Sequence, residues 1–138
     1  MEISRRTDYA VRMLLELAQS DGAPVSVRTL VDRQNVPYAF ARGIQRDLAN
    51  AGLVITKRGV TGGMVIARHP REITLLEVVE AMQGPIFSAV CTRDTEWCTV
   101  MQGCRVHGVW GHVDVMVREY LGGQDLAGLV PGKESEVR

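Results

Sequence analysis

Residues 38–67 read YAFARGIQRDLANAGLVITKRGVTGGMVIA, and this stretch decides the fold. Its first part carries apolar residues at helical spacing, which predicts a helix over residues 38–51 that ends at Gly52. Two short apolar segments follow, at residues 53–57 and 64–67, and they predict two strands around a glycine-rich turn. The chain therefore contains a helix that leads directly into a β-hairpin.

Two more helices are expected before this stretch. Apolar residues recur at helical spacing over residues 9–20, and the turn residues 21–22 supply a stop. A shorter helix begins at the N-cap candidate Ser26 and runs to about Gln34, before a turn at residues 35–37. Two helices joined by a tight turn, the second ending in glycine, predict a helix-turn-helix unit. The inner face of its second helix is expected to consist of Phe40, Ile44, Leu48 and Ala51.

The outer face of the helix over residues 38–51 is polar and basic. Arg42 and Arg46 lie four residues apart, so they share a face opposite the apolar stripe. Arginine can pair with guanine and glutamine with adenine in a major groove, while a basic, glycine-rich hairpin tip suits a minor groove or phosphates. The alternatives are an ordinary solvated helix face and a plain hairpin turn. The candidate DNA-contacting residues are Tyr38, Arg42, Gln45, Arg46, Lys57 and Arg58.

A second informative stretch is the C-x6-C-x5-C-x2-H run formed by Cys91, Cys98, Cys104 and His107, which contains every cysteine of the chain. Three thiolates and an imidazole in one loop form a ligand set suited to an iron–sulfur cluster or to zinc. An odd number of cysteines cannot pair completely into internal disulfides. The alternative is that the thiols are buried or incidental.

Composition narrows the class of protein. The 138 residues carry no net charge, yet residues 1–73 have eleven Lys/Arg against seven Asp/Glu, whereas residues 74–138 have five against nine. Such asymmetry can mean that one half meets a polyanion. The N-terminus lacks the apolar stretch of an export signal, and no apolar run is long enough to cross a bilayer, so we expect a soluble cytoplasmic protein without a membrane partner. No catalytic triad or nucleotide-binding motif is recognisable, and we do not expect an enzyme.

Two helices are predicted in the second half. Thr74 is placed to cap a helix that runs to Gln83, before the stop at residues 84–85. A longer helix over residues 105–121 carries an apolar stripe formed by Val106, Val109, Trp110, Val113, Val117 and Tyr120. A chain this small has few places to bury that stripe, so it either packs on the first half or pairs with a second copy.

The sequence resembles the Rrf2 family of bacterial winged-helix regulators over residues 2–130, and in particular its iron–sulfur members, the IscR-, NsrR- and RirA-like proteins. The resemblance is carried by AGLV at residues 51–54, RGVTGG at 58–63, ITLLEVVEA at 73–81 and the cysteine–histidine run. It implies a mainly α fold with a small β wing, and a homodimer that binds a double-stranded DNA operator as a repressor or an activator.

The resemblance also implies a division of the chain. Residues 1–73 would form the winged helix-turn-helix domain. Residues 74–130 would supply a linker helix, a cluster-binding loop and a long dimerisation helix. Residues 131–138 are expected to be a disordered tail, because they are short and polar.

Two sets of cluster ligands are implied. The stretch from Cys104 to Trp110 is similar to the pattern of IscR-like members, in which three cysteines and His107 would hold a [2Fe-2S] cluster. Residues 7–10 instead resemble NsrR-like members, in which Asp8 would reach a [4Fe-4S] cluster of the partner chain. Without the resemblance, Asp8 is most simply an N-cap of the first helix. We favour His107 and [2Fe-2S]; the alternative function is a zinc-stabilised DNA-binding or protein-interaction module without a redox sensor.

Overall fold

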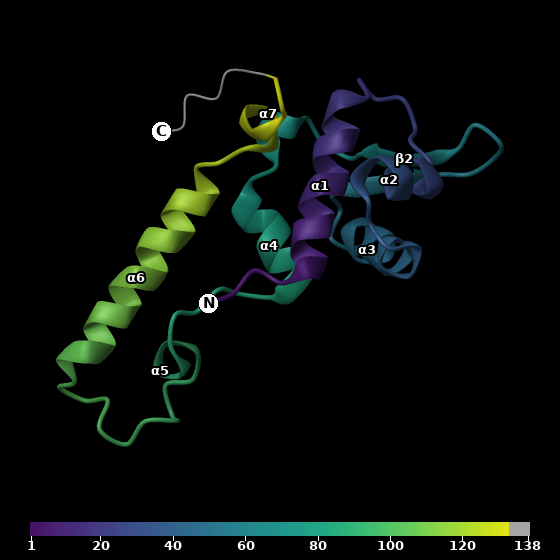
Figure 1. The fold of residues 1–138 in the computed structure, drawn as a ribbon. Helices are drawn as coiled ribbons and strands as arrows, with labels where there is room; N and C mark the ends of the chain where they lie inside the picture. Colours follow the sequence, from purple (N-terminus) through teal and green to yellow (C-terminus); the bar gives the residue numbers. More distant parts are fainter. Residues whose placement is uncertain (133–138) are drawn as a thin grey trace.

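The computed structural model describes residues 1–132 of the chain. Most of the chain is helical, and a small antiparallel sheet is the β component, as predicted. Figure 1 shows α1, α2, α3 and the hairpin gathered into one body, with α4 beside α1 on the side toward α6, and α6 running apart from that body. The elements are α1 (Arg5–Gln19), α2 (Val27–Gln34), α3 (Tyr38–Asn50), β1 (Val54–Lys57), β2 (Gly63–Ile66), η1 (Pro70–Glu72), α4 (Leu75–Gln83), α5 (Val90–Arg93), α6 (Arg105–Gly122) and α7 (Leu126–Leu129).

Helix α1 begins earlier than expected, and the prediction that Asp8 is its N-cap is wrong. Ser4 is the N-cap, because its side-chain oxygen accepts a hydrogen bond from the backbone N–H of Thr7 at 3.1 Å. Asp8 lies one turn inside the helix. The caps predicted for α2 and α4 are confirmed: Ser26 and Thr74 accept the corresponding bonds from residues three positions later.

Helix α3 confirms the helix-turn-helix prediction but not all of its inner face. Ile44 and Leu48 are fully buried, whereas Phe40 is 45% exposed and Ala41 is the buried residue one position later. Phe40 instead packs edge-on against Tyr9 of α1, with the ring centroids 5.8 Å apart. Ala51, also expected inside, is exposed, and Gly52 follows with a φ of 74°. The large ring of Phe40 therefore lies at the edge of the core, and the small side chain of Ala41 lies inside it.

The hairpin is tied to the turn that precedes α2. Strands β1 and β2 pair antiparallel, with Val54 opposite Ile66 and Lys57 opposite Gly63. Met64 also exchanges two backbone hydrogen bonds with Val25, of 2.8 and 2.9 Å. The backbone of Gly63 lies so close to Val25 that an added Cβ would meet the Val25 carbonyl at 2.5 Å, so this contact requires glycine.

One core joins most of the elements. It contains buried side chains of α1, α2, α3 and the hairpin, and it also takes in Val78 of α4 and Leu126 of α7. The short elements η1, α5 and α7 are absent from the sequence-based prediction. α7 folds back on α1 and η1, and Leu126 donates its backbone N–H to Ile73. The predicted tail falls mostly on residues 133–138, outside the described residues.

Helix α6 has the predicted bounds to within a residue, but none of its side chains is buried. Its packing contacts are with α4 and α5. Figure 1 shows it extending well beyond α4, with the loop from α5 at its far end. Within residues 1–132, no helix is long and apolar enough to span a membrane.

Candidate functional site

The first candidate surface is the outward side of α3. Arg42 and Arg46 are exposed there, and Tyr38 is 55% exposed at the start of the helix. Gln45 is half-buried, and its amide nitrogen lies 3.4 Å from the Thr56 hydroxyl of β1. A shallow depression of about 460 Å³ is lined by Arg42, Gly43, Gln45, Arg46, Ala49 and Thr56. Four of the six candidate DNA-contacting residues therefore belong to one end or one side of α3.

The remaining two candidates lie on the hairpin. Lys57 ends β1, Arg58 begins the turn, and both are exposed. Val60 at the tip is fully exposed, so the turn projects freely from the body, as Figure 1 shows. A positively charged projection beside a basic helix can follow a DNA backbone or enter a minor groove.

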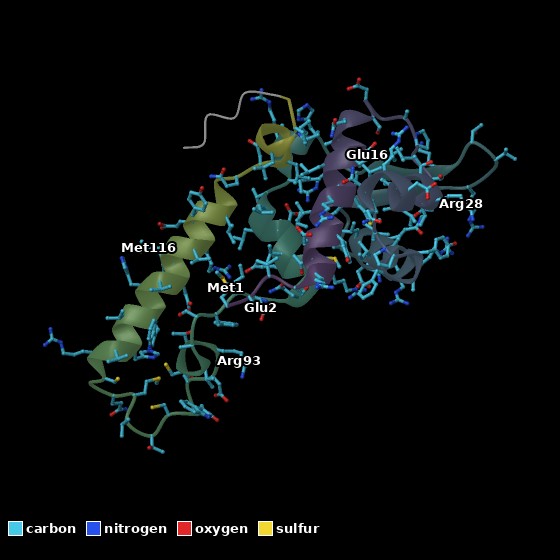
Figure 2. The ribbon with its side chains drawn as sticks, in the orientation of Figure 1. Met1, Glu2, Glu16, Arg28, Arg93 and Met116 are labelled. Atoms are coloured by element: carbon cyan, nitrogen blue, oxygen red, sulfur yellow. The ribbon has the colours of Figure 1, made fainter. Side chains whose placement is uncertain are left out.

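Two further arginines stand near this surface, and sequence reasoning missed both. Arg6 of α1 forms an ion pair with Asp47 of α3, and its guanidinium lies beside Gly43. Arg28 lies in the first turn of α2, is exposed, and projects from the body in Figure 2. The adjacent arginines at residues 5–6 were a signal in the sequence, but only the fold brings Arg6 to α3.

The second candidate site is the loop between α5 and α6. Cys91 lies in α5, Cys98 in the loop, and Cys104 is the N-cap residue of α6; all three are free thiols and half-buried. Within residues 1–132, no three Cys, His, Asp or Glu side chains converge closely enough to hold a single metal ion.

His107 has an unusual ring nitrogen. It lies in the first turn of α6, and its Nδ1 atom is buried without a hydrogen-bond partner among the described residues. Buried polar atoms are nearly always bonded to protein, water or metal, so this nitrogen is free to accept a bond from water or to bind a metal. His107 and the three thiols have the donor types that an iron–sulfur cluster or zinc takes, but as they stand they do not converge on one ion.

The alternative ligand Asp8 is far from this loop in the sequence and is engaged elsewhere. Its carboxylate forms an ion pair with Arg12 at 2.6 Å on the exposed side of α1. The Arg12 guanidinium also lies 5.6 Å from the centre of the Tyr9 ring. The other two histidines, His69 and His112, are exposed.

Helix α6 also holds the segment that contains Cys91. Asp114 accepts a 2.6 Å hydrogen bond from the backbone N–H of Ser88, and the Ser88 hydroxyl donates to the Trp110 carbonyl at 3.1 Å. Partial burial acts to raise the pKa of Asp114, but hydrogen bonds from Ser88 and Thr92 and the charge of Arg118 outweigh it, so the pKa is lowered below 3.8.

Comparison with known proteins agrees with this architecture. The Rrf2 family, described as iron-dependent transcriptional regulators, matches residues 3–132. NsrR of Shouchella clausii is 32% identical over 111 residues, which cover 79% of this chain and 74% of the relative.

Solved structures agree as well. The structure of CymR, the global cysteine regulator of B. subtilis, has a TM-score of 0.77 at 25% identity and covers 94% of this chain and 96% of its own. T. potens IscR has a TM-score of 0.73 at 27% identity, covering 97% and 89%. Since the family match spans nearly the whole described chain, this protein belongs to the Rrf2 family of transcriptional regulators.

Proposed function

We propose that this protein is a homodimeric regulator whose affinity for a DNA operator is controlled by an iron–sulfur cluster held in the α5–α6 loop. The sensing part is carried by His107, whose buried Nδ1 atom has no hydrogen-bond partner among the described residues and which follows three half-buried thiols along the same stretch of chain. The exposed arginines of α3 and the basic hairpin support the DNA-binding part. When bound, a cluster would supply a redox-sensitive and nitric-oxide-sensitive group, and this chain's residues hold it and transmit its state.

The dimer is supported by the exposed side of α6. Val106, Val109, Val113, Met116 and Tyr120 follow one another at spacings of three and four residues, which places them along one side of the helix. All are exposed except Val113, which is half-buried, and Figure 2 shows Met116 on the side of α6 away from the body. Two copies can bury this seam against each other, and the paired winged helices would then read half-sites about one helical turn of DNA apart.

A charge placed in the seam tests the dimer. Val109→Glu should convert the dimer to monomer at micromolar concentrations, because pairing would bury the carboxylate in an apolar contact. Val115→Glu is the matched control, since Val115 is similarly exposed, 49% against 57%, but lies on another side of α6. Molar mass by light scattering gives the result. Equal behaviour of the two variants would contradict pairing through this seam.

The cluster is tested by purifying the protein without oxygen. We expect a coloured protein with iron and acid-labile sulfide, and loss of the colour in Cys98→Ala with the fold intact by circular dichroism. Operator affinity should differ between the loaded and the cluster-free dimer by about 5- to 150-fold. A colourless wild type that holds zinc would instead favour the zinc-stabilised module, since Cys3His also suits tetrahedral zinc.

The fourth ligand is tested by three substitutions. With His107 as ligand, His107→Ala should abolish or convert the visible spectrum of the cluster, whereas Asp8→Ala should leave it nearly unchanged. His112→Ala is the matched control, because His112 is an exposed histidine of the same helix. The [2Fe-2S] form is favoured with His107. A spectrum that depends on Asp8 and not on His107 would favour the [4Fe-4S] alternative with a ligand from the partner chain.

A continuous set of contacts supports coupling between the loop and the DNA-binding surface. Arg118 of α6 forms an ion pair with Glu80 of α4. At the end of α4, the Gln83 amide oxygen accepts hydrogen bonds of 2.7 Å from the Thr7 hydroxyl and 3.1 Å from the Ser4 backbone. Thr7 is fully buried in α1, so α4 is fixed to the helix that supports α3. A double-mutant cycle on Arg118 and Glu80 measures whether this contact carries coupling energy. Operator affinity is measured for each variant, once with the cluster loaded and once without it.

A further inference from the structure

Helix α6 has a second face, distinct from its exposed seam. His107, Asp114, Arg118 and Leu121 recur at spacings of three, four and seven residues, so they lie along one side of the helix, and all four are half-buried. Arg118 contacts α4, and Asp114 contacts the segment before α5. His107 lies two turns before Asp114 on this face. The candidate ligand histidine and the anchor of the Cys91 segment therefore share one rigid support.

The contacts of Asp114 bracket Cys91. Ser88, three residues before Cys91, donates its backbone N–H to the carboxylate at 2.6 Å, and Thr92, one residue after, has its hydroxyl nearby. The two hydroxyl groups have other acceptors. The Ser88 hydroxyl donates to the Trp110 carbonyl at 3.1 Å, and the Thr92 hydroxyl donates to the Ala89 carbonyl at 2.9 Å. A hydroxyl has only one proton to donate. The backbone bond from Ser88 is thus the firm contact of the carboxylate. Hydrogen bonds to a charged acceptor are stronger than neutral ones.

Ile86 is buried just before this segment, but among the described residues few other contacts hold residues 88–97. Helix α5 is four residues long, and no side chain in it is buried or caps its N-terminus. Residues 93–97 beyond it are exposed. A segment with few buried contacts opens easily unless a specific bond restrains it. The bonds to α6 are therefore what fixes the place of Cys91 relative to His107.

We infer that Asp114 is a positioning residue for the ligand loop: it fixes the Cys91 segment to the face of α6 that carries His107. This inference rests on the proposed function for its role in cluster binding, but the anchoring itself exists without a cluster. Asp114 touches no candidate ligand directly. Its neighbour Arg118 extends the same support to Glu80, so the loop and the linker helix are held by adjacent turns of α6.

Limited trypsin digestion of the cluster-free protein tests the anchoring. Arg93 is an exposed cleavage site on α5, and Figure 2 shows it directed away from α6. Asp114→Ala should speed cleavage after Arg93 roughly tenfold, because the loss of a charge-assisted bond favours opening. The cleavage rate of Asp114→Asn should lie between those of wild type and Asp114→Ala, because the amide oxygen of asparagine can still accept the hydrogen bond from Ser88. Cleavage after Arg46, inside packed α3, should stay unchanged in every variant and reports global unfolding.

A matched control and a second readout complete the experiment. Glu119→Ala removes a neighbouring acid of α6 whose side chain forms no ion pair or hydrogen bond among the described residues, and it should behave as wild type. In anaerobically loaded protein, Asp114→Ala should lose its visible absorbance in air about five- to tenfold faster than wild type, with Asp114→Asn between them.

The outcomes are separable. Unchanged cleavage after Arg93 in Asp114→Ala overturns the anchoring, whatever the protein binds. Faster cleavage with unchanged iron content and lability overturns the positioning of ligands by Asp114. A wild type that acquires no cluster overturns the proposed sensing function, while the digestion still decides whether Asp114 anchors the loop.

Discussion

The body built from α1, α2, α3 and the hairpin and the helix α6 are packed in opposite ways. In the body, Leu14, Leu30 and Leu48 are fully buried in one core. α6 spans 18 residues, and no side chain of it is buried. The body therefore stabilises itself through apolar burial, whereas α6 leaves apolar side chains in water. The packing of the body is therefore complete within one chain, whereas α6 leaves a face open to whatever packs against it.

The largest effect that tests this comparison is a cavity in the body. Leu14→Ala should lower the free energy of unfolding by about 3–5 kcal/mol, because Leu14 is fully buried and the core cannot close around the void. Val115→Ala in α6 is the counterpart and should change it by less than about 0.5 kcal/mol. Urea denaturation of the cluster-free protein at fixed concentration measures both. A large loss in Val115→Ala would show that this side of α6 is covered, and would break the comparison.

A pair of glycine substitutions should give opposite signs in the two regions. Gly63→Ala should destabilise the protein by roughly 2–4 kcal/mol, because the new Cβ would collide with the Val25 backbone. Gly111→Ala in α6 should stabilise it by about 0.5–1 kcal/mol, because its Cβ would meet no atom within 4 Å and alanine favours the helix. Thermal unfolding followed by circular dichroism checks the signs. Stabilisation by Gly63→Ala would mean that the hairpin is free of the turn before α2.

The sequence predicted elements where local signals were strong. Ser26 and Thr74 marked helix starts because a capping side chain acts on residues three positions away, within the same segment. The start of α1 was misplaced because its first turn, Arg5 to Asp8, consists of polar residues, so apolar periodicity begins only at Ala10. The exposed side of α6 also differs from the predicted apolar stripe. The predicted stripe included Val117, which is half-buried, and omitted Met116, which is 56% exposed.

The candidate sites divide in the same way. Residue type and spacing predicted the cysteine–histidine loop and the arginines of α3, because each signal lies within one short stretch of sequence. The supports of these sites depend on contacts between distant segments, such as Gln83 with Thr7 and Asp114 with Ser88. No periodicity or motif in the sequence predicts such a pair. Arg6 beside α3 is another case, because only the packing of α1 on α3 brings it there.

Substitutions on the DNA-reading surface should change binding without changing the packed body. Arg46→Ala should weaken operator binding by roughly 1–3 kcal/mol if the side chain pairs with a base, and Arg42→Ala by a similar amount. Arg58→Ala at the hairpin should weaken binding to most sequences and reduce the salt slope by about one unit. Fluorescence anisotropy at several salt concentrations separates the two patterns. Unchanged affinity in all three variants would place the DNA on another surface.

The smallest effect concerns pH and the anchoring of α6. Despite partial burial, hydrogen bonds and the charge of Arg118 lower the pKa of the Asp114 carboxyl from its ordinary value in the folded protein, so the unfolded chain takes up this proton at a higher pH than the folded one. The ionised carboxylate therefore adds stability at neutral pH, and this contribution fades as the pH falls through the lowered folded pKa. Asp114→Asn lacks the titrating group, while the other carboxylates are common to both proteins. The difference in unfolding free energy between wild type and Asp114→Asn should thus be present at neutral pH and shrink in acid, as the pH falls through the lowered folded pKa. Urea denaturation of the two cluster-free proteins across this range measures the difference, and a gap that does not vary with pH would mean that charge has no part in fixing the loop to α6.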